Sequence, residues 1–164
     1  PITSPTAPKK PVAIRKLFCP DAAPMTRLAP RVARECIRRL LADGRANPVV
    51  TVLGLTFKED VPDIRNSKVV DIITELKNFG ITVQAHDPMA SAEEVHHEFG
   101  IDLLDQSQLA KADAVILAVA HKSYMENGWS LISNLLKPGK AIVLDVKGAL
   151  PRISRPDGLD VWSL

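Results

Sequence analysis

Apolar runs and amphipathic stretches alternate along most of this chain. Residues 49–55 form a mostly apolar run typical of a buried parallel strand, and residues 67–79 carry apolar side chains at the spacing of one helix face. We expect Ser67 to be the N-cap of that helix and Gly80 to end it. The same alternation predicts strands at 81–85, 114–120, 141–144 and 159–162, helices at 91–99, 105–110 and 129–136, and a short strand or extended link at 101–104.

Strands that alternate with helices of about ten residues predict an α/β fold. The expected form is a Rossmann-like, three-layer αβα domain with a mostly parallel sheet, preceded by one helix. Because right-handed crossovers place all strand carboxyl ends on one edge, the polar residues that follow the strands should gather there. These residues are Lys58, Asp87, His121, Asp145 and Lys147. A ligand crevice at that edge is the general expectation for this architecture.

The amino-terminal part of the chain has a different character. Residues 1–24 contain six prolines, which predicts an extended or disordered tail, and a helix is expected from about 26 to 42. Through Asn47 the chain carries ten Lys and Arg against three Asp and Glu. The helix lacks the aromatic residues that stack on bases, so we interpret its charge as a solvated face rather than a nucleic-acid surface. Its arginines are Arg27, Arg31, Arg34, Arg38 and Arg39, and its expected apolar partners are Leu28, Val32, Ile37, Leu40 and Leu41.

Composition places the chain among ordinary globular proteins. It has 164 residues, of which 46% are hydrophobic and 24% charged, enough for one domain with a proper core. No run is long and apolar enough to span a bilayer, and residues 1–24 lack the apolar segment of a signal peptide. Cys19 and Cys36 are expected outside the core pattern and reduced, which predicts a cytoplasmic location. Cys19 has only Arg15 and Lys16 near it, so we do not expect it to act as a nucleophile.

The turn after the first strand holds the strongest candidate chemistry. Gly54 stands alone there, without the further glycines of a dinucleotide fingerprint, so a complete NAD site is not expected. Lys58 and Arg65 are candidate anion ligands between a strand and a helix start. The alternative is that they form surface ion pairs with nearby Glu59, Asp60 or Asp63.

Weaker candidates follow later strands. Lys147 could bind an anion or simply be exposed, and Asp87 could bind a ribose or start an Asp-Pro turn. His121 could act as an acid or base, although a hydrogen-bonded loop histidine is favoured. Glu93 and His97 could share a metal, but a solvated helix face is favoured, and we expect no metal site.

The residues from Gly54 to Ser67, in the order GLTFKED and PDIRNS, carry a family resemblance. With Asp87-Pro88, the AVAH run ending at His121, the LDVKG run around Lys147 and the chain end GLDVWSL, they resemble the C-terminal domain of the UDP-glucose/GDP-mannose dehydrogenases. The versions around His121 and Lys147 resemble the branch that oxidises UDP-N-acetylhexosamines for bacterial capsule and O-antigen synthesis. The resemblance covers about residues 25–164.

Full-length members of this family are NAD-dependent oxidoreductases that convert a UDP-sugar to a UDP-uronic acid. The resemblance implies that Phe57 and Lys58 contact the sugar nucleotide and that Lys147 binds the nucleotide. It also implies that Arg65 reaches the NAD held by a separate domain. Residues 25–48 would be the end of the central helix, the expected contact of a homodimer, and residues 49–164 the UDP-binding domain.

Two parts of the family pattern are missing from this sequence. No glycine-rich NAD fingerprint precedes residue 49, and no Gly-Gly-His-Cys segment supplies the catalytic cysteine. We therefore expect an excised or truncated UDP-sugar-binding domain, without a catalytic residue, inactive alone and without stable NAD binding. A UDP-sugar is the expected partner, with no nucleic acid and no membrane. The competing hypothesis is a non-catalytic interaction module that dimerises through the basic helix, and a self-sufficient oxidoreductase is disfavoured.

Overall fold

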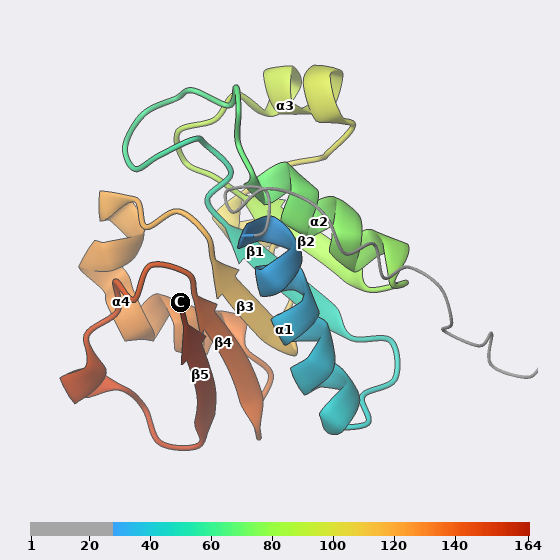
Figure 1. Ribbon diagram of the computed structural model, residues 1–164. Coiled ribbons are helices and arrows are strands. Elements are labelled where there is room, and N and C mark those ends of the chain that lie inside the picture. The colour runs from blue at the N-terminus through green and yellow to red at the C-terminus, as the bar shows by residue number, and fades with distance from the viewer. Residues whose placement is uncertain (1–27) are drawn as a thin grey trace, which may run out of the picture.

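The computed structural model describes residues 28–164. The predictions for the proline-rich tail, for Cys19 and for the first residues of the basic helix lie outside this range. Within it, the chain forms a parallel five-stranded sheet with the order β2-β1-β3-β4-β5 (Figure 1). The predicted Rossmann-like α/β fold is confirmed. The strands are β1 (Val49–Leu53), β2 (Thr82–His86), β3 (Ala114–Leu117), β4 (Ala141–Asp145) and β5 (Leu159–Ser163).

Helices cover both faces of this sheet. Alternate residues of a strand point to opposite faces, so Ile116 packs in one hydrophobic cluster while its neighbours Val115 and Leu117 pack in another. The helices α1 (Leu28–Ala42) and α2 (Val69–Asn78) pack against each other on the first face, and α4 (Lys122–Leu135) covers the second. Helix α3 (Ala92–Phe99) follows β2 and adds Val95 to the first cluster (Figure 1).

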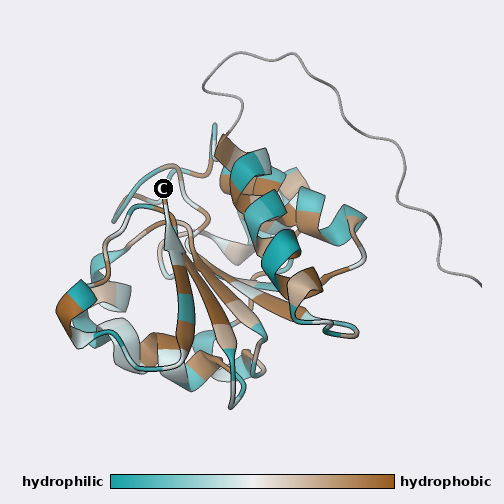
Figure 2. Cartoon of the chain, turned by 60° about the horizontal axis from the view of Figure 1, so that its bottom comes forward, coloured by the Kyte–Doolittle hydropathy of each residue, from teal (hydrophilic) through white to brown (hydrophobic). Residues whose placement is uncertain are grey.

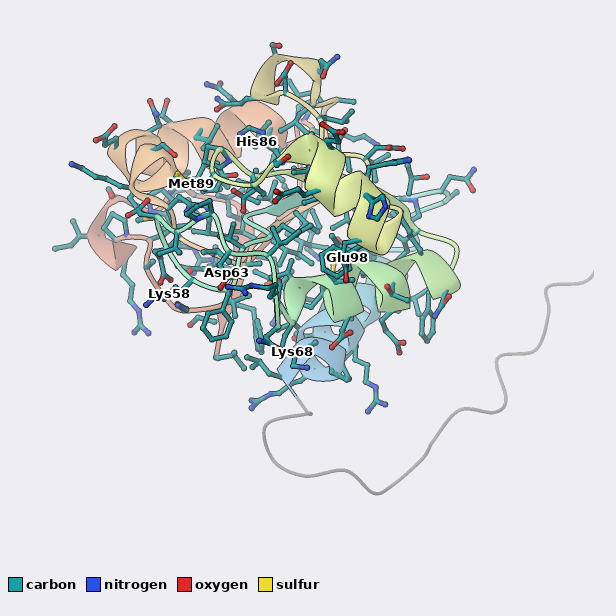
Figure 3. The ribbon with its side chains drawn as sticks, turned by 90° about the horizontal axis from the view of Figure 1, so that it is seen from above. Lys58, Asp63, Lys68, His86, Met89 and Glu98 are labelled. Atoms are coloured by element: carbon teal, nitrogen blue, oxygen red, sulfur yellow. The ribbon has the colours of Figure 1, made fainter. Side chains whose placement is uncertain are left out.

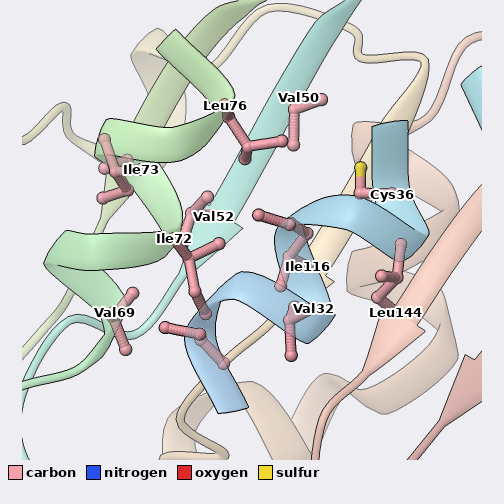
Figure 4. Packing of buried hydrophobic residues seen from close by; sticks show 14 of the residues in the cluster. Val32, Cys36, Val50, Val52, Val69, Ile72, Ile73, Leu76, Ile116 and Leu144 are labelled. Atoms are coloured by element: carbon pink, nitrogen blue, oxygen red, sulfur yellow. The ribbon is translucent and has the colours of Figure 1, made fainter. Parts of the chain in front are cut away.

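The first cluster corrects the prediction for Cys36. This cysteine was expected outside the core, but it is fully buried between α1 and the sheet, and burial raises the pKa of its thiol to about 12 (Figure 4). Leu28 and Leu41 were expected to be apolar partners, yet they are 41% and 62% exposed. The reason is that α1 buries a narrow stripe, which takes in Cys36 and leaves out both leucines. The stripe consists of Ala29, Val32, Ala33, Cys36, Ile37 and Leu40.

Hydropathy follows these layers across the molecule. The strands are mostly apolar, and the outward side of α1 is polar (Figure 2). Among residues 28–164, no helix has both the length and the apolar character to cross a bilayer.

The predicted helix at 129–136 is too short. Helix α4 begins at Lys122, and Gly128 interrupts it with non-helical angles of φ 46° and ψ −127°. The prediction missed the first turns because residues 122–127 are mostly polar, and because Gly128 resembles a boundary. Tyr124 and Trp129, on either side of the kink, both pack in the second cluster.

Several other boundaries differ by a few residues. The strand predicted at 49–55 ends at Leu53, because Gly54 adopts a φ of +84° and turns the chain. The N-cap position of α2 is assigned to Lys68, one residue after the predicted Ser67, but Ser67 supplies the capping bond, because its hydroxyl oxygen accepts the N–H of Val69 at 3.3 Å. The same hydroxyl donates to the carbonyl of Leu55 and so ties the start of the helix to the end of the strand.

The segment between β2 and β3 is largely as predicted. Ser91 caps α3 by accepting the N–H of Glu94 at 3.3 Å, and Gly100 ends it in the left-handed conformation. The link at 101–104 pairs with β2 through a single bridge of Leu103. The short helix predicted at 105–110 is one 3-10 turn, Gln106–Gln108.

Candidate functional site

The carboxyl edge of the sheet brings together four loops. The chain passes from β1 to the neighbouring β2 and returns to β3 on the other side of β1, so the order reverses between β1 and β3. Ligands of open α/β sheets bind at such a reversal, outside the carboxyl ends of the strands. Figure 3 views the molecule from above, with Lys58 and Asp63 in the loop after β1.

Asp87 lies at the centre of this edge and its side chain is fully buried. Its Oδ2 accepts the N–H groups of Leu55 and Thr56, and its Oδ1 accepts that of Met89 at 2.7 Å. Burial by itself raises the pKa of Asp87, but the hydrogen bonds from His121 and from these amides outweigh it and hold the pKa well below its usual range. The Asp87 carboxylate thus accepts backbone N–H groups from the loops after β1 and β2 and points into the protein, so it does not face a ribose.

His121 is also fully buried and joins Asp87 to the loop after β1. Its Nδ1 accepts the backbone N–H of Asp60 at 3.0 Å, and its Nε2 lies 3.1 Å from Asp87 Oδ2 and 3.2 Å from Thr56 Oγ1. Because an N–H group can only donate, Nδ1 must carry the lone pair, and the ring proton is on Nε2. The favoured interpretation of a hydrogen-bonded loop histidine is confirmed. We call Thr56, Asp87 and His121 the His121 clamp.

The clamp connects to the start of α4. The Tyr124 hydroxyl donates to the carbonyl of His86 at 2.9 Å, and its ring meets the imidazole of His121 edge-on at 5.6 Å. Burial raises the pKa of Tyr124, which keeps this donor protonated. The carboxylate of Asp60 accepts the N–H of Lys122, the first residue of α4, at 2.9 Å. The loops after β1, β2 and β3 are therefore joined into one unit.

Gly54 is required where the loop after β1 begins. Its φ of +84° is a conformation that other residues rarely adopt, and its N–H donates to the His86 carbonyl at 2.9 Å. A Cβ placed on Gly54 would lie 2.6 Å from the carbonyl oxygen of Val119. This glycine thus lets two segments of the chain approach each other. A dinucleotide fingerprint needs further glycines after this one so that the backbone can approach a pyrophosphate, and the turn here holds Phe57 and Lys58 instead, so these residues do not fit NAD in that way.

Phe57 and Lys58 project from the turn that the clamp holds. The side chain of Phe57 is 58% exposed, although its backbone N–H donates to the Asp63 carbonyl at 2.7 Å. Lys58 is exposed and makes no side-chain hydrogen bond or ion pair with any residue of 28–164. Buried hydrogen bonds therefore hold the backbone of the turn, while the side chains of Phe57 and Lys58, the two predicted contacts, face outward.

Arg65 and Lys147 each have a partner. Arg65 bonds both oxygens of Asp63, at 3.0 and 3.1 Å, and this holds the pKa of Asp63 below its ordinary value. Lys147 Nζ donates to Glu59 and lowers the pKa of that carboxyl. The ion-pair alternative therefore holds for Arg65 and fails for Lys58, and the pairing of Lys147 with Glu59 was not foreseen. Exposed pairs contribute about 0–1 kcal/mol, so a ligand can replace either partner.

Of the four candidate residues, Arg65 alone lines the cavity beside α3. A cavity of about 1350 Å³ lies between the loop 61–66 and α3, with Arg65 and Asp63 in its lining but not Phe57, Lys58 or Lys147. In Figure 3, Asp63 lies between Lys58 and Glu98, a residue of α3 that also lines the cavity. Arg65 thus faces a different space from Lys58 and Lys147.

The histidines of α3 show no sign of a metal centre. His96 Nδ1 lies 2.7 Å from Asp102 Oδ1 in an exposed pair, and His97 lines the cavity beside α3. Within the part of the chain that the structure describes, no three His, Cys, Asp or Glu side chains gather closely enough to hold a metal ion.

Comparison with known proteins agrees with this geometry. Residues 51–152 match the family model described as the UDP binding domain of the UDP-glucose/GDP-mannose dehydrogenases. The chain belongs to this family. It is 45% identical over 125 residues to protein CapL of Staphylococcus aureus, an alignment that covers 75% of this chain and 29% of CapL. The predicted resemblance to the UDP-binding domain of these dehydrogenases is confirmed.

Two further relatives separate the branches of the family. The UDP-N-acetyl-D-glucosamine 6-dehydrogenase of Pseudomonas aeruginosa is 43% identical over 112 residues, which is 67% of this chain and 25% of the relative. The UDP-glucose 6-dehydrogenase of Rickettsia prowazekii is only 28% identical over 105 residues, 62% of this chain and 24% of the relative. The predicted similarity to the UDP-N-acetylhexosamine branch is confirmed. The chain spans less than a third of the length of these curated relatives.

Solved structures share the fold. An NDP-N-acetyl-D-galactosaminuronic acid dehydrogenase from Methanosarcina mazei superposes with a TM-score of 0.72 at 17% identity, covering 92% of this chain and 34% of its own. The UDP-N-acetyl-mannosamine dehydrogenase Cap5O of S. aureus gives 0.63 at 24% identity, covering 82% of this chain and 29% of its own. At these identities the likeness concerns the fold alone.

Proposed function

We propose that this domain binds the nucleotide part of a UDP-sugar at the carboxyl edge of its sheet, as the UDP-binding part of a UDP-sugar 6-dehydrogenase. Phe57 and Lys58 are the primary contacts. The observation that carries the proposal is the unpaired ammonium group of Lys58 on a turn whose backbone is held by buried hydrogen bonds. A diphosphate needs such a cation, and the exposed ring of Phe57 offers a face on which a planar or sugar ring can pack.

Lys147 is the second cation of the proposed site. It reaches Glu59, the residue after Lys58, so its ammonium group lies at the same turn. The side chains of Lys147 and Glu59 are 54% and 34% exposed, which makes their pair weak enough for a diphosphate to replace Glu59. The two lysines would then balance the two negative charges of the diphosphate of a UDP-sugar.

Arg65 has a separate proposed role. Its guanidinium is 84% exposed, held by Asp63 and facing the cavity beside α3 rather than Lys58. We assign it to an NAD molecule bound by another domain of the full dehydrogenase. We expect no such NAD site within residues 28–164, because Gly54 packs against Val119 and the Asp87 carboxylate is bound internally. The chain alone is expected to be inactive as a dehydrogenase, and its cytoplasmic location stays a prediction.

Calorimetric titration with UDP tests the proposed site. Lys58→Ala removes a charged contact to phosphate worth about 1.5–3 kcal/mol, so the affinity should fall roughly tenfold to a hundredfold. Lys77→Ala is the matched control. It removes the same charge from the far end of α2 and should leave the affinity unchanged. Absence of UDP binding by the folded chain, or equal affinities of Lys58→Ala and the parent, would contradict the proposal.

The interaction module remains the second candidate. Exposed Leu28 and Leu41 on α1 favour it, and the homodimer expected through this helix stays a proposal. The charge of α1 is partly used within the chain, since Arg39 bonds both Glu35 and Asp160. Light scattering decides between the two, because a monomer at high concentration removes the dimerisation module while UDP binding at the edge would persist.

A further inference from the structure

We propose that His121 is a positioning residue for nucleotide binding, which holds the Phe57–Lys58 turn in its binding shape without touching the ligand. This inference rests on the proposed function of the turn. His121 has no exposed surface, so it cannot itself contact a nucleotide at the edge. Its two ring nitrogens, however, both bond residues that flank the turn.

The hydrogen bonds of His121 enclose Phe57 and Lys58 from both sides. Thr56, directly before the pair, lies with its Oγ1 3.2 Å from Nε2, and its hydroxyl donates to the Lys58 carbonyl at 3.1 Å. Asp60, two residues after Lys58, donates its N–H to Nδ1 at 3.0 Å. The His121 ring therefore holds Thr56 and Asp60, on either side of Phe57 and Lys58. It leaves the side chains of Phe57 and Lys58 free to contact a nucleotide.

The conformation of Asp60 gives the Nδ1 bond a specific task. Asp60 has a φ of 57°, in the left-handed region that residues with a side chain adopt uncommonly, although Asp does so more readily than most. Two bonds hold it here: its N–H to His121 and its carboxylate to the N–H of Lys122. Without the acceptor on His121, the Asp60 backbone loses one of these restraints, and the turn can relax.

The orientation of the ring is itself determined. Asp87 Oδ2 lies 3.1 Å from Nε2, and the same oxygen accepts the N–H groups of Leu55 and Thr56. Tyr124 supports the ring from its edge. Since the buried carboxylate needs a donor, Nε2 carries the proton, and Nδ1 is left as the acceptor that Asp60 requires. Asp87 thus acts on the turn through His121 as well as directly.

Holding the turn in advance reduces the ordering cost that a ligand would otherwise meet. Two amide variants of His121 separate its two bonds. His121→Asn can place Oδ1 near the position of Nδ1 and keep the bond from Asp60, whereas His121→Gln can place its amide N–H near Nε2 and keep only the bond to Asp87. Loss of the Asp60 bond should weaken UDP binding by about tenfold, and its retention should keep the affinity within about threefold of the parent.

The experiment combines UDP calorimetry with ¹⁵N relaxation of residues 55–60 in the parent, His121→Asn, His121→Gln and His121→Leu. We expect the turn to stay ordered in the Asn variant and to become mobile in the Gln and Leu variants. The affinity for UDP should be retained where the turn stays ordered and should fall where it becomes mobile. Trp129→Phe is the control for general loss of stability, since it removes the bond from the indole N–H to the Pro151 carbonyl, in the second hydrophobic cluster and outside the His121 clamp, and leaves the bonds of the turn unchanged. Its UDP affinity should equal that of the parent.

Two results overturn the inference, and neither depends on the other. If the Leu and Gln variants fold and keep both parental affinity and an ordered turn, His121 does not position the turn. If ¹⁵N spectra of the parent show the proton on Nδ1, the proposed bond from Asp60 does not exist, and this measurement needs no variant to fold. Absence of UDP binding by the parent would refute the proposed function alone, because turn order in the His121 variants would still decide the role of this residue.

Discussion

Gly54→Ala tests the close contact between Gly54 and the backbone of Val119 at the carboxyl edge of the sheet. The substitution adds one methyl group at a φ of +84°, directed at the backbone of Val119. The added Cβ would lie 2.6 Å from the Val119 carbonyl oxygen and 2.8 Å from its nitrogen. Backbone atoms cannot rotate away as a flexible side chain does, so the segment after β3 must shift.

The expected cost has two parts. The left-handed conformation costs an alanine about 1–2 kcal/mol, and forcing atoms into a packed region costs about 1–3 kcal/mol more. Gly80→Ala isolates the first part, because Gly80 has a similar φ of +76° and a Cβ added there would meet no atom within 4 Å beyond its chain neighbours. The difference between the two variants is therefore the steric part, about 1–3 kcal/mol.

Urea unfolding at pH 7 measures both variants against the parent. We expect the free energy of unfolding to fall more for Gly54→Ala than for Gly80→Ala, with unchanged dependence on urea in both. The backbone N–H of His121 donates to the Val119 carbonyl at 3.1 Å. A shift of Val119 should therefore also disturb the His121 clamp and weaken UDP binding in Gly54→Ala but not in Gly80→Ala. Equal destabilisation of the two variants, within about 0.5 kcal/mol, would refute the close approach.

Three further predictions concern other charged or reactive groups. Glu59→Gln should strengthen UDP binding about twofold to fivefold in calorimetry, since it releases Lys147 and removes a carboxylate from the site, and weaker binding would contradict the assignment. In a Cys19→Ser background, Cys36 should react with a thiol reagent only as the protein unfolds, because burial raises its pKa to about 12; prompt labelling of the native protein would disprove its burial. The pKa of Asp87 is lowered in the fold, so its stabilising effect is complete above its ordinary value of 3.8 and is lost as the pH falls below it. Asp87→Asn should therefore reduce stability at pH 7 by about 1–3 kcal/mol and flatten the decline of stability as the pH falls below 3.8 in urea titrations, and a parental acid slope would argue against the clamp.

The order of elements was readable from the chain because each central strand is buried on both faces. Residues 49–53 and 114–117 are apolar at nearly every position, as central parallel strands must be. Helix α4 was only half recognised, since its first turns are polar and Gly128 breaks the pattern. Cys36 was misplaced for a different reason. Burial on α1 depends on which narrow stripe meets the sheet and α2, and the pattern of arginines and leucines does not define that stripe.

The candidate ligands divide in the same way. Lys58, Arg65 and Lys147 could be named because polar residues that follow parallel strands gather at one edge, whereas Phe57 was named only because the family resemblance implies it. Their partners could not be named. The bonds of the site join residues far apart in the chain, such as Thr56 to Asp87 and Glu59 to Lys147, which are 31 and 88 residues apart.

By itself, the sequence determined the α/β fold, the family and the edge at which chemistry is expected, because these follow from local patterns and from a long ordered signature. The tertiary structure decided which charges are available. It buried Asp87 and His121 as an internal clamp, paired Arg65 with Asp63, and left Lys58 unpaired among the described residues. The physical reason is that a charge is committed or free according to its burial and its nearest donors, and both are set only when loops from three strands meet at one edge.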